Sequence, residues 1–116
     1  MDDNQNIIRP CILWNDTRSF KECEEFEDQN FDVRTISGNI VMPGFTAPKI
    51  NWIKKNELKN FKKIFKVLLP KDFLRMFLTG EFFSEMSDAS GTLWLDIKQR
   101  KWSDELLSCS FLEEKN

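Results

Sequence analysis

The chain is organised around the stretch Met42-Pro43-Gly44-Phe45-Thr46-Ala47-Pro48-Lys49-Ile50-Asn51-Trp52. Proline fixes φ and glycine allows backbone conformations closed to other residues, so Pro43 and Gly44 predict a turn. Thr46-Ala47-Pro48 is typical of a helix start, and the amphipathic helix that follows should reach about Asn56. A loop at a helix N-terminus can hold a polar ligand, although a Pro-Gly turn before a helix is more often purely structural.

The composition allows one compact domain and argues against several classes of function. The chain has 116 residues, of which 41% are hydrophobic. Charged residues make up 31% with a net charge of only −2, so no strong field is available to gather phosphates, and nucleic-acid binding is not expected. Cys11, Cys23 and Cys109 fit reduced thiols better than a disulfide framework. The absence of histidine excludes histidine-based triads and histidine metal sites.

The N-terminal sequence predicts a cytoplasmic protein without membrane contact. Residues 1–6 are acidic and polar, the opposite of a secretory signal. No apolar run approaches the roughly 20 residues that span a bilayer.

Before the 42–52 stretch, the sequence predicts a strand and a helix. Residues 6–14 are rich in bulky and β-branched side chains, which indicates an extended segment leading into a short buried strand that ends at Asn15-Asp16. Asp16 or Thr17 can cap a helix over about residues 18–29, whose Phe20, Cys23 and Phe26 would share one face. Its carboxylates suggest a solvated face, with a metal-binding cluster as the less favoured alternative. They are Glu22, Glu24, Glu25, Glu27 and Asp28.

After that stretch, further short elements are predicted. Gly38 should end a helical turn that begins near Phe31, and Pro70 should open a largely buried helix. Ser103, with acidic residues behind it, should cap a last short helix. The remaining expectations are a second amphipathic helix at 57–65, a buried strand at 66–69, an extended segment at 81–86, a turn at 87–92 and a strand at 93–97. Lysines on the helices between 49 and 63 fit an exposed face, and a basic surface for an acidic partner remains open.

No catalytic motif follows from the residues alone. The chain has no glycine-rich phosphate loop, nucleophile elbow, paired cysteines or internal repeat. Asp16 and Asp88 each lie beside a turn at the end of an apolar segment, where capping or turn hydrogen bonds are the more typical role. The predicted fold class at this point is α/β or α+β.

Several segments nevertheless resemble, in order and approximate spacing, the xylulokinases of the FGGY carbohydrate kinase family. The resemblance spans nearly the whole chain. The segments are residues 9–18, 35–39, 42–49, 67–75, 78–81, 86–96 and 102–107.

This resemblance implies an α/β fold: part of the N-terminal domain of an actin-like ATPase with ribonuclease-H-like halves, helix-rich with a few short strands. Residues 1–112 would form the partial domain and residues 113–116 a charged tail. The family transfers the γ-phosphoryl of ATP, with magnesium, to a sugar hydroxyl, here giving D-xylulose 5-phosphate. Its phosphate-facing aspartate and a sugar-contacting Met-His pair would lie upstream, and its catalytic base and adenine site downstream. No catalytic, ATP-binding or metal-binding residue is therefore expected in this chain, and the isolated chain should be inactive.

The resemblance also implies part of a sugar site. The loop of Met42, Pro43, Gly44 and Phe45 would face the cleft, and Gly44, where glycerol kinases carry an aromatic residue, would make room for a larger ketose. Asp16 is the second candidate, more as a scaffold than as a direct ligand. Thr17 stands where glycine is common in the family, which affects the geometry expected there.

Expected partners are a ketopentose and either the missing kinase halves or a second copy of the chain. The alternative is a non-catalytic binding or interaction domain derived from a sugar kinase.

Overall fold

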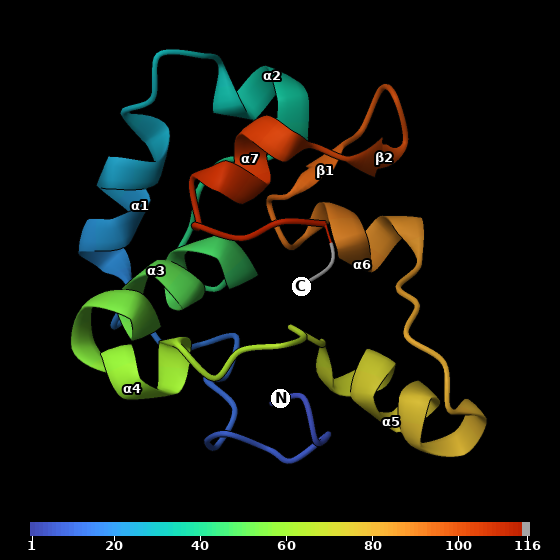
Figure 1. Cartoon of the computed structure of the whole chain (residues 1–116). Helices are drawn as coiled ribbons and strands as arrows, with labels where there is room; N and C mark the ends of the chain where they lie inside the picture. The colour runs from blue at the N-terminus through green and yellow to red at the C-terminus, as the bar shows by residue number, and fades with distance from the viewer. Residues whose placement is uncertain (115–116) are drawn as a thin grey trace.

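A computed structural model describes residues 1–114 of the chain, and the last two residues of the predicted charged tail lie outside the described residues. Figure 1 shows the arrangement of the elements. They are α1 (Phe20–Glu27), α2 (Val33–Ser37), α3 (Thr46–Asn56), α4 (Leu58–Phe61), α5 (Pro70–Thr79), α6 (Met86–Ser90), β1 (Leu95–Asp96), β2 (Lys101–Trp102) and α7 (Asp104–Ser108).

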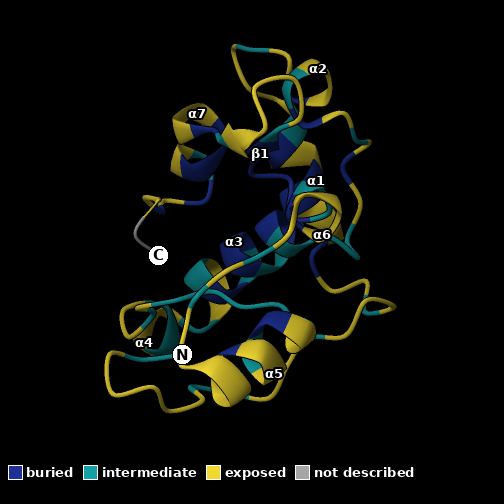
Figure 2. Cartoon of the chain, turned by 90° about the vertical axis from the view of Figure 1, so that its right-hand side faces the viewer, coloured by how far each residue is buried: buried dark blue, intermediate teal, exposed yellow. Residues whose placement is uncertain are grey.

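The core lies around α3, which begins and ends where the sequence predicts. Ala47 and Ile50 of this helix are buried, and α1 packs against it with Phe26, which is 1% exposed. Leu93, before β1, and Leu106 of α7 complete the centre of the cluster. Buried residues in Figure 2 accordingly concentrate on α3, α1 and α7, whereas α5 is mostly exposed.

Local signals in the sequence set several helix ends correctly. Gly38 has φ 69° and ends α2, as predicted. A Cβ at this glycine would also lie 2.3 Å from the end of the Ile97 side chain, which would have to shift. The Ser103 side chain accepts a hydrogen bond from the Leu106 amide and caps α7, and Pro70 occupies the first turn of α5. These three predictions are confirmed.

The two buried strands predicted at residues 6–14 and 66–69 do not form. Within residues 1–114 the sheet consists of β1 and β2, an antiparallel pair of two residues each with Leu95 opposite Trp102. A strand needs a neighbour that exchanges hydrogen bonds with it. Residues 6–14 form no such ladder. The chain at 66–69 meets the start of the chain, where Phe65 and Lys66 donate to the Met1 carbonyl and the Met1 ammonium donates to the Lys66 carbonyl, but this pairing does not extend into a ladder. The predicted strand at 93–97 shortens to β1.

Three helix predictions also need correction. The helix expected to be largely buried, α5, buries Met76 but leaves Phe77 77% exposed, because no described element covers its outer face. The predicted helix at 57–65 shortens to α4. The predicted turn at 87–92 is partly occupied by the one-turn helix α6, which begins at Met86 in the segment predicted to be extended, because the Glu85 carboxylate caps the amides of Ser87 and Asp88.

The acidic helix α1 differs from its prediction on both faces. Phe20 is exposed and Glu22 is buried, so the predicted apolar face keeps only Cys23 and Phe26. The buried Glu22 carboxylate lies 3.3 Å from the ammonium of Lys55 on α3. An opposite charge at this distance offsets part of the cost of burying a carboxylate.

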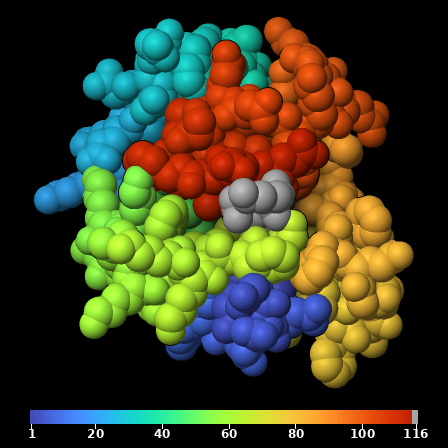
Figure 3. All heavy atoms as spheres, viewed as in Figure 1, coloured from blue at the N-terminus to red at the C-terminus, as the bar shows by residue number. Residues whose placement is uncertain are grey.

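Tryptophan environments differ sharply between the two ends of the chain. Trp94 is buried and its indole N–H donates to the hydroxyl of Ser110 over 2.9 Å. Trp14 is 81% exposed, in the segment predicted to be a strand. Figure 3 shows the first residues of the chain lying between α4 and α5 on the face opposite α2. None of the helices within residues 1–114 is long and apolar enough to cross a membrane.

Candidate functional site

The 42–45 loop is fixed by hydrogen bonds to three of its carbonyl groups. The Phe45 amide donates to the Met42 carbonyl over 3.0 Å, which closes the predicted turn. The Ser19 hydroxyl donates to the Pro43 carbonyl over 3.2 Å. The ammonium of Lys49 donates to the Gly44 carbonyl over 2.7 Å. The loop is therefore held by one internal hydrogen bond, by Ser19 before α1 and by Lys49 near the start of α3.

Gly44 brings the loop into contact with the Trp14–Asp16 segment. A Cβ at Gly44 would lie 2.7 Å from the backbone oxygen of Trp14, closer than Cβ atoms approach other heavy atoms. Glycine is thus required here by close backbone approach, a reason separate from any space that it leaves for a sugar. The two regions predicted to form the site, the 42–45 loop and the Trp14–Asp16 segment, therefore lie side by side.

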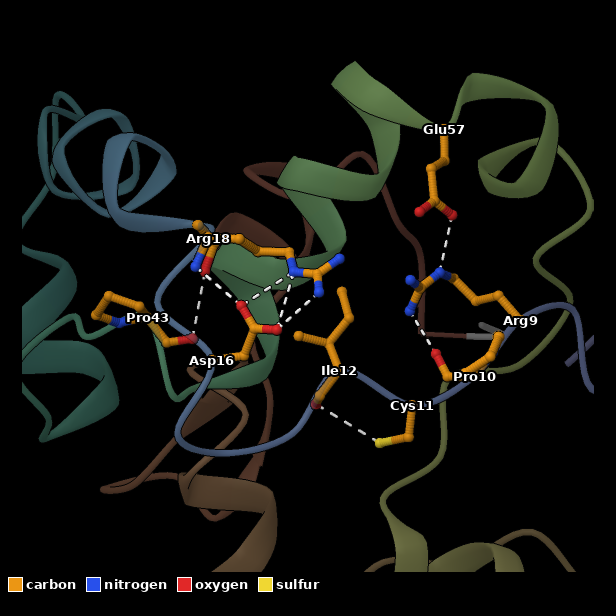
Figure 4. A network of polar contacts seen from close by, with 9 residues as sticks. Arg9, Pro10, Cys11, Ile12, Asp16, Arg18, Pro43 and Glu57 are labelled. Carbon is orange, nitrogen blue, oxygen red and sulfur yellow. Dashed lines mark hydrogen bonds and ion pairs between the residues drawn. The ribbon is translucent and has the colours of Figure 1, made fainter.

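Asp16 is engaged by Arg18 within a turn. Its carboxylate accepts from the Arg18 amide over 3.0 Å and from the Arg18 guanidinium over 2.8 Å, and the two groups face each other in Figure 4. These hydrogen bonds hold the pKa of Asp16 below its usual value. Arg18 in turn lies over the ring of Trp52, 4.8 Å from its centroid, which ties the segment to α3. Asp16 therefore has the turn-forming role that its position predicts.

The other end of this segment is tied down by a second ion pair. Arg9 donates to the carboxylate of Glu57, between α3 and α4, over 2.8 Å (Figure 4). Hydrogen bonds from Asn60 and then Arg9 lower the pKa of Glu57. Residues 9–18 are thus anchored at Arg9 to the C-terminal end of α3 and at Arg18 to Trp52 within the same helix.

Between these anchors lies a groove of about 890 Å³. Its walls come from residues 7–14, from α3 and from residues 66–71. Gly44 and Lys49 lie in the wall, so the groove runs up to the 42–45 loop. The lining is largely apolar, with Ile12, Ile50 and Ile53 among its residues.

The predicted site residues differ in accessibility. Met42 is 49% exposed, whereas Pro43, Gly44, Phe45 and Asp16 are half-buried. Sequence reasoning gave little weight to Trp14 and none to Lys49, which lie in contact with or beside this loop. An aromatic residue directly before the Asn15-Asp16 turn was the signal available for Trp14. The signal available for Lys49 was its position five residues after Gly44, in the first turn of the helix that follows the loop.

The acidic side chains of the described residues do not form a magnesium site. No three acidic, histidine or cysteine side chains within residues 1–114 converge as metal ligands would. Asp72 and Asp88 both face the ammonium of Lys71, at 2.7 and 3.4 Å, and so act as partners of a cation. No chemical step through a metal or nucleotide can be derived from these residues.

Comparison with known proteins gives a match over almost the whole chain. The N-terminal domain of the FGGY family of carbohydrate kinases matches residues 1–115. The chain belongs to this family. The resemblance expected from the sequence is thereby confirmed.

The FGGY relatives include several xylulose kinases. The xylulose kinase of Klebsiella pneumoniae is 52% identical over 108 residues, which cover 93% of this chain and 22% of the relative. That of Escherichia coli K12 is 53% identical over 107 residues, covering 92% of this chain and 22% of the relative. The chain spans less than a quarter of the length of these relatives.

Solved structures confirm the expected fold. A xylulose kinase from Brucella ovis is 54% identical, with a TM-score of 0.95 over 99% of this chain and 24% of that one. A second structure, from Rhodospirillum rubrum, shares the fold at 24% identity with a TM-score of 0.92. The chain has the helix-rich architecture of part of an FGGY kinase N-terminal domain, an actin-like ATPase fold, with two short strands among the described residues.

Proposed function

We propose that this chain forms part of the sugar-binding domain of a xylulose kinase, which transfers the γ-phosphoryl of ATP to D-xylulose and releases D-xylulose 5-phosphate and ADP. The observation that carries the proposal is the identity of 52–54% to xylulose kinases over more than nine-tenths of the chain. Membership of a carbohydrate kinase family implies ATP as the donor and a sugar as the acceptor.

The sugar would bind where the 42–45 loop meets the Trp14–Asp16 segment. Trp14 offers an exposed aromatic ring, an amphipathic surface of the kind that covers the apolar face of a sugar ring. Met42, Pro43, Gly44 and Phe45 provide the opposing wall, with a backbone fixed by hydrogen bonds. Asp16, whose carboxylate is engaged by Arg18, supports this arrangement by holding the turn after Trp14.

Catalysis would require groups from the rest of the enzyme. Phosphoryl transfer depends on a positioned base, a phosphate cradle and magnesium, which act by orientation and charge stabilisation. The described residues supply neither the metal ligands nor a free carboxylate beside the loop. The isolated chain should accordingly release no ADP with xylulose and magnesium ATP.

The apolar groove would be covered by the remaining part of such a kinase. The relatives are more than four times longer than this chain, so a large part of a kinase is available to occupy it. Ile7 and Leu13 beside the groove are 67% and 61% exposed, and residues 6–14 form no ladder with a described strand, although the Asn6 and Leu13 carbonyls accept local hydrogen bonds. An extended segment with free backbone groups can add a strand from a partner.

A chimera tests this proposal directly. The matched 107-residue segment of the E. coli xylulose kinase is replaced by the corresponding part of this chain, and ADP release is measured with xylulose and magnesium ATP. We expect phosphorylation of xylulose by the chimera and none by the chain alone. Gly44→Tyr in the chimera should raise KM for xylulose at least tenfold, because even the Cβ meets the Trp14 oxygen at 2.7 Å. Lys59→Met, on the exposed surface of α4, is the control.

Three outcomes would contradict the proposal. A folded chimera that leaves xylulose unphosphorylated argues against the sugar-kinase role. ADP release by the isolated chain argues against the proposal that catalysis requires groups from the rest of the enzyme. An unchanged KM in the Gly44→Tyr chimera argues against the loop as the sugar wall. An inactive chimera together with tight binding of another protein by the chain would favour the interaction-domain alternative.

A further inference from the structure

Lys49 supplies the one charged donor among the three that hold the 42–45 loop. The donors to the Met42 and Pro43 carbonyls are a backbone amide and a hydroxyl, at 3.0 and 3.2 Å. The ammonium of Lys49 reaches the Gly44 carbonyl at 2.7 Å. Hydrogen bonds from a charged donor are shorter and stronger than those between neutral groups. This bond fixes the residue whose backbone lies against Trp14.

The surroundings of Lys49 do not explain why a lysine occupies this position. Lys49 is half-buried in the wall of the groove, and burial lowers the pKa of its ammonium. Within residues 1–114 no carboxylate lies within 4.0 Å of it. Asp16, which is paired with Arg18, acts on Lys49 from farther away and offsets only part of the effect of burial on its pKa. Removing a cation from water without an acidic partner costs free energy.

The position on the helix is unfavourable for a cation as well. Lys49 is the fourth residue of α3, close to the helix N-terminus, where the macrodipole disfavours positive charge. By contrast, Lys55, near the other end of α3, pairs with Glu25 and is favourably placed. The stability of α3 therefore does not explain why a lysine occupies position 49, whereas the contact of Lys49 with the loop does.

We propose that Lys49 is a positioning residue of the sugar site, which holds the Gly44 carbonyl and so sets the separation between the 42–45 loop and Trp14. The inference rests on the sugar-binding role proposed above. Lys49 acts through the loop and need not touch the sugar. Without its ammonium, the Gly44 carbonyl loses its described donor, and the loop can move away from the Trp14 backbone.

Substitutions of Lys49 separate this role from general stability. Lys49→Met keeps much of the length of the side chain but removes the donor. Lys49→Arg keeps a charged donor that can reach the same carbonyl. Lys59→Met makes the same chemical change as Lys49→Met on the exposed surface of α4, away from the loop.

The first measurement uses the full 116-residue chain without any ligand. Hydrogen–deuterium exchange is followed in peptides that span residues 41–47, where the Phe45 amide is hydrogen-bonded to Met42. We expect exchange to accelerate about tenfold in Lys49→Met and to stay within about threefold of the parent in Lys49→Arg and Lys59→Met. Peptides from α7 report whether the core stays folded.

The second measurement uses the chimera with the E. coli enzyme. Lys49→Met should raise KM for xylulose about tenfold and leave kcat within about twofold, because the loop contributes binding and not chemistry. Lys49→Arg should recover most of the affinity.

Failure of this inference is distinguishable from failure of the proposed function. Unchanged exchange at 41–47 in Lys49→Met would overturn the role of Lys49, whatever the chimera does. A loss of kcat with unchanged KM would overturn it too, as would equal acceleration in Lys49→Met and Lys49→Arg. Should the parent chimera be inactive, the sugar-kinase proposal fails, and the exchange data still decide whether Lys49 holds the loop.

Discussion

Phe26 of α1 is 1% exposed and Phe77 of α5 is 77% exposed, although both lie at helical positions whose pattern predicts burial. The first belongs to the α3 region, formed by α1, α2, α3, the β1–β2 pair and α7. The second belongs to the groove region, formed by residues 1–14 and 62–85. In the α3 region the apolar side chains of α1, α3 and α7 meet in one core, although Phe20 of α1 stays exposed. In the groove region α5 buries Met76, but its outer face with Phe77 meets none of the described elements, because an amphipathic pattern specifies a face to be covered but not what covers it.

Truncation of the two phenylalanines should give the largest difference between the regions. Phe26→Ala should lower the free energy of unfolding by about 3–5 kcal/mol, because it leaves a cavity in a packed core. Phe77→Ala should change it by less than about 0.5 kcal/mol, since the ring is already in water. Urea titration followed by circular dichroism measures both. Equal losses would mean that α5 is covered in solution, for example by a second copy of the chain.

Removal of a helix cap in the α3 region should have a smaller effect. Ser103→Ala deprives the Leu106 amide of its partner at the start of α7 and should cost about 1 kcal/mol. Ser108→Ala, at the exposed end of the same helix, is the matched control and should be close to neutral. The same urea titrations compare the two variants. A neutral Ser103→Ala would show that packing alone sets the start of α7.

Thiol chemistry should distinguish the regions without changing the fold. Burial, followed by the nearby acidic side chains, raises the pKa of Cys23 to about 11, so its thiol stays protonated in the folded chain at pH 8. Cys11 in the groove region is exposed. A chromogenic disulfide reagent at pH 8 should therefore modify Cys11 quickly and Cys23 only on unfolding. Because Cys109 is a third, half-buried thiol, the test uses a Cys109→Ser background. Fast modification of two thiols in that background would contradict this difference, and adding Cys11→Ser leaves Cys23 as the single thiol for the control.

The same shift predicts a weak dependence of stability on alkaline pH. The folded pKa of Cys23 lies above the value of 9.0 for an unperturbed thiol, so the folded state retains its proton longer than the unfolded state. The stabilising contribution is complete below about pH 9 and is lost as the pH rises toward 11. Urea titrations of the parent and of Cys23→Ala at pH 8 and pH 10.5 should show a smaller decline in the variant. An equal decline in the free energy of unfolding of the two proteins would mean that groups other than Cys23 cause the loss of stability at alkaline pH.

Elements with a local cause could be predicted from the sequence. Gly38, Pro70 and Ser103 each act on the backbone within four residues, and each ends or begins a helix as expected. The predicted strands at 6–14 and 66–69 failed because strand formation depends on a distant partner, which hydrophobic pattern cannot supply.

The candidate site divides in the same way. The turn at Pro43-Gly44 and the turn hydrogen bonds of Asp16 follow from residue type. The bond from Ser19 to Pro43 and the pairing of Arg9 with Glu57 join residues 24 and 48 positions apart. No local pattern marks such contacts, so the approach of the loop to Trp14 could not be derived before the structure.

The contrast between Trp94 and Trp14 gives the molecule two optical reporters. Indole emission shifts to longer wavelength in water, so buried Trp94, bonded to Ser110, should emit at shorter wavelength than exposed Trp14. Acrylamide should quench Trp14 first. In a variant that keeps these two indoles, with phenylalanine replacing Trp52 and Trp102, protection of the long-wavelength emission would signal that a sugar or another part of a kinase has covered the groove. The short-wavelength emission would serve as the internal reference for an intact core.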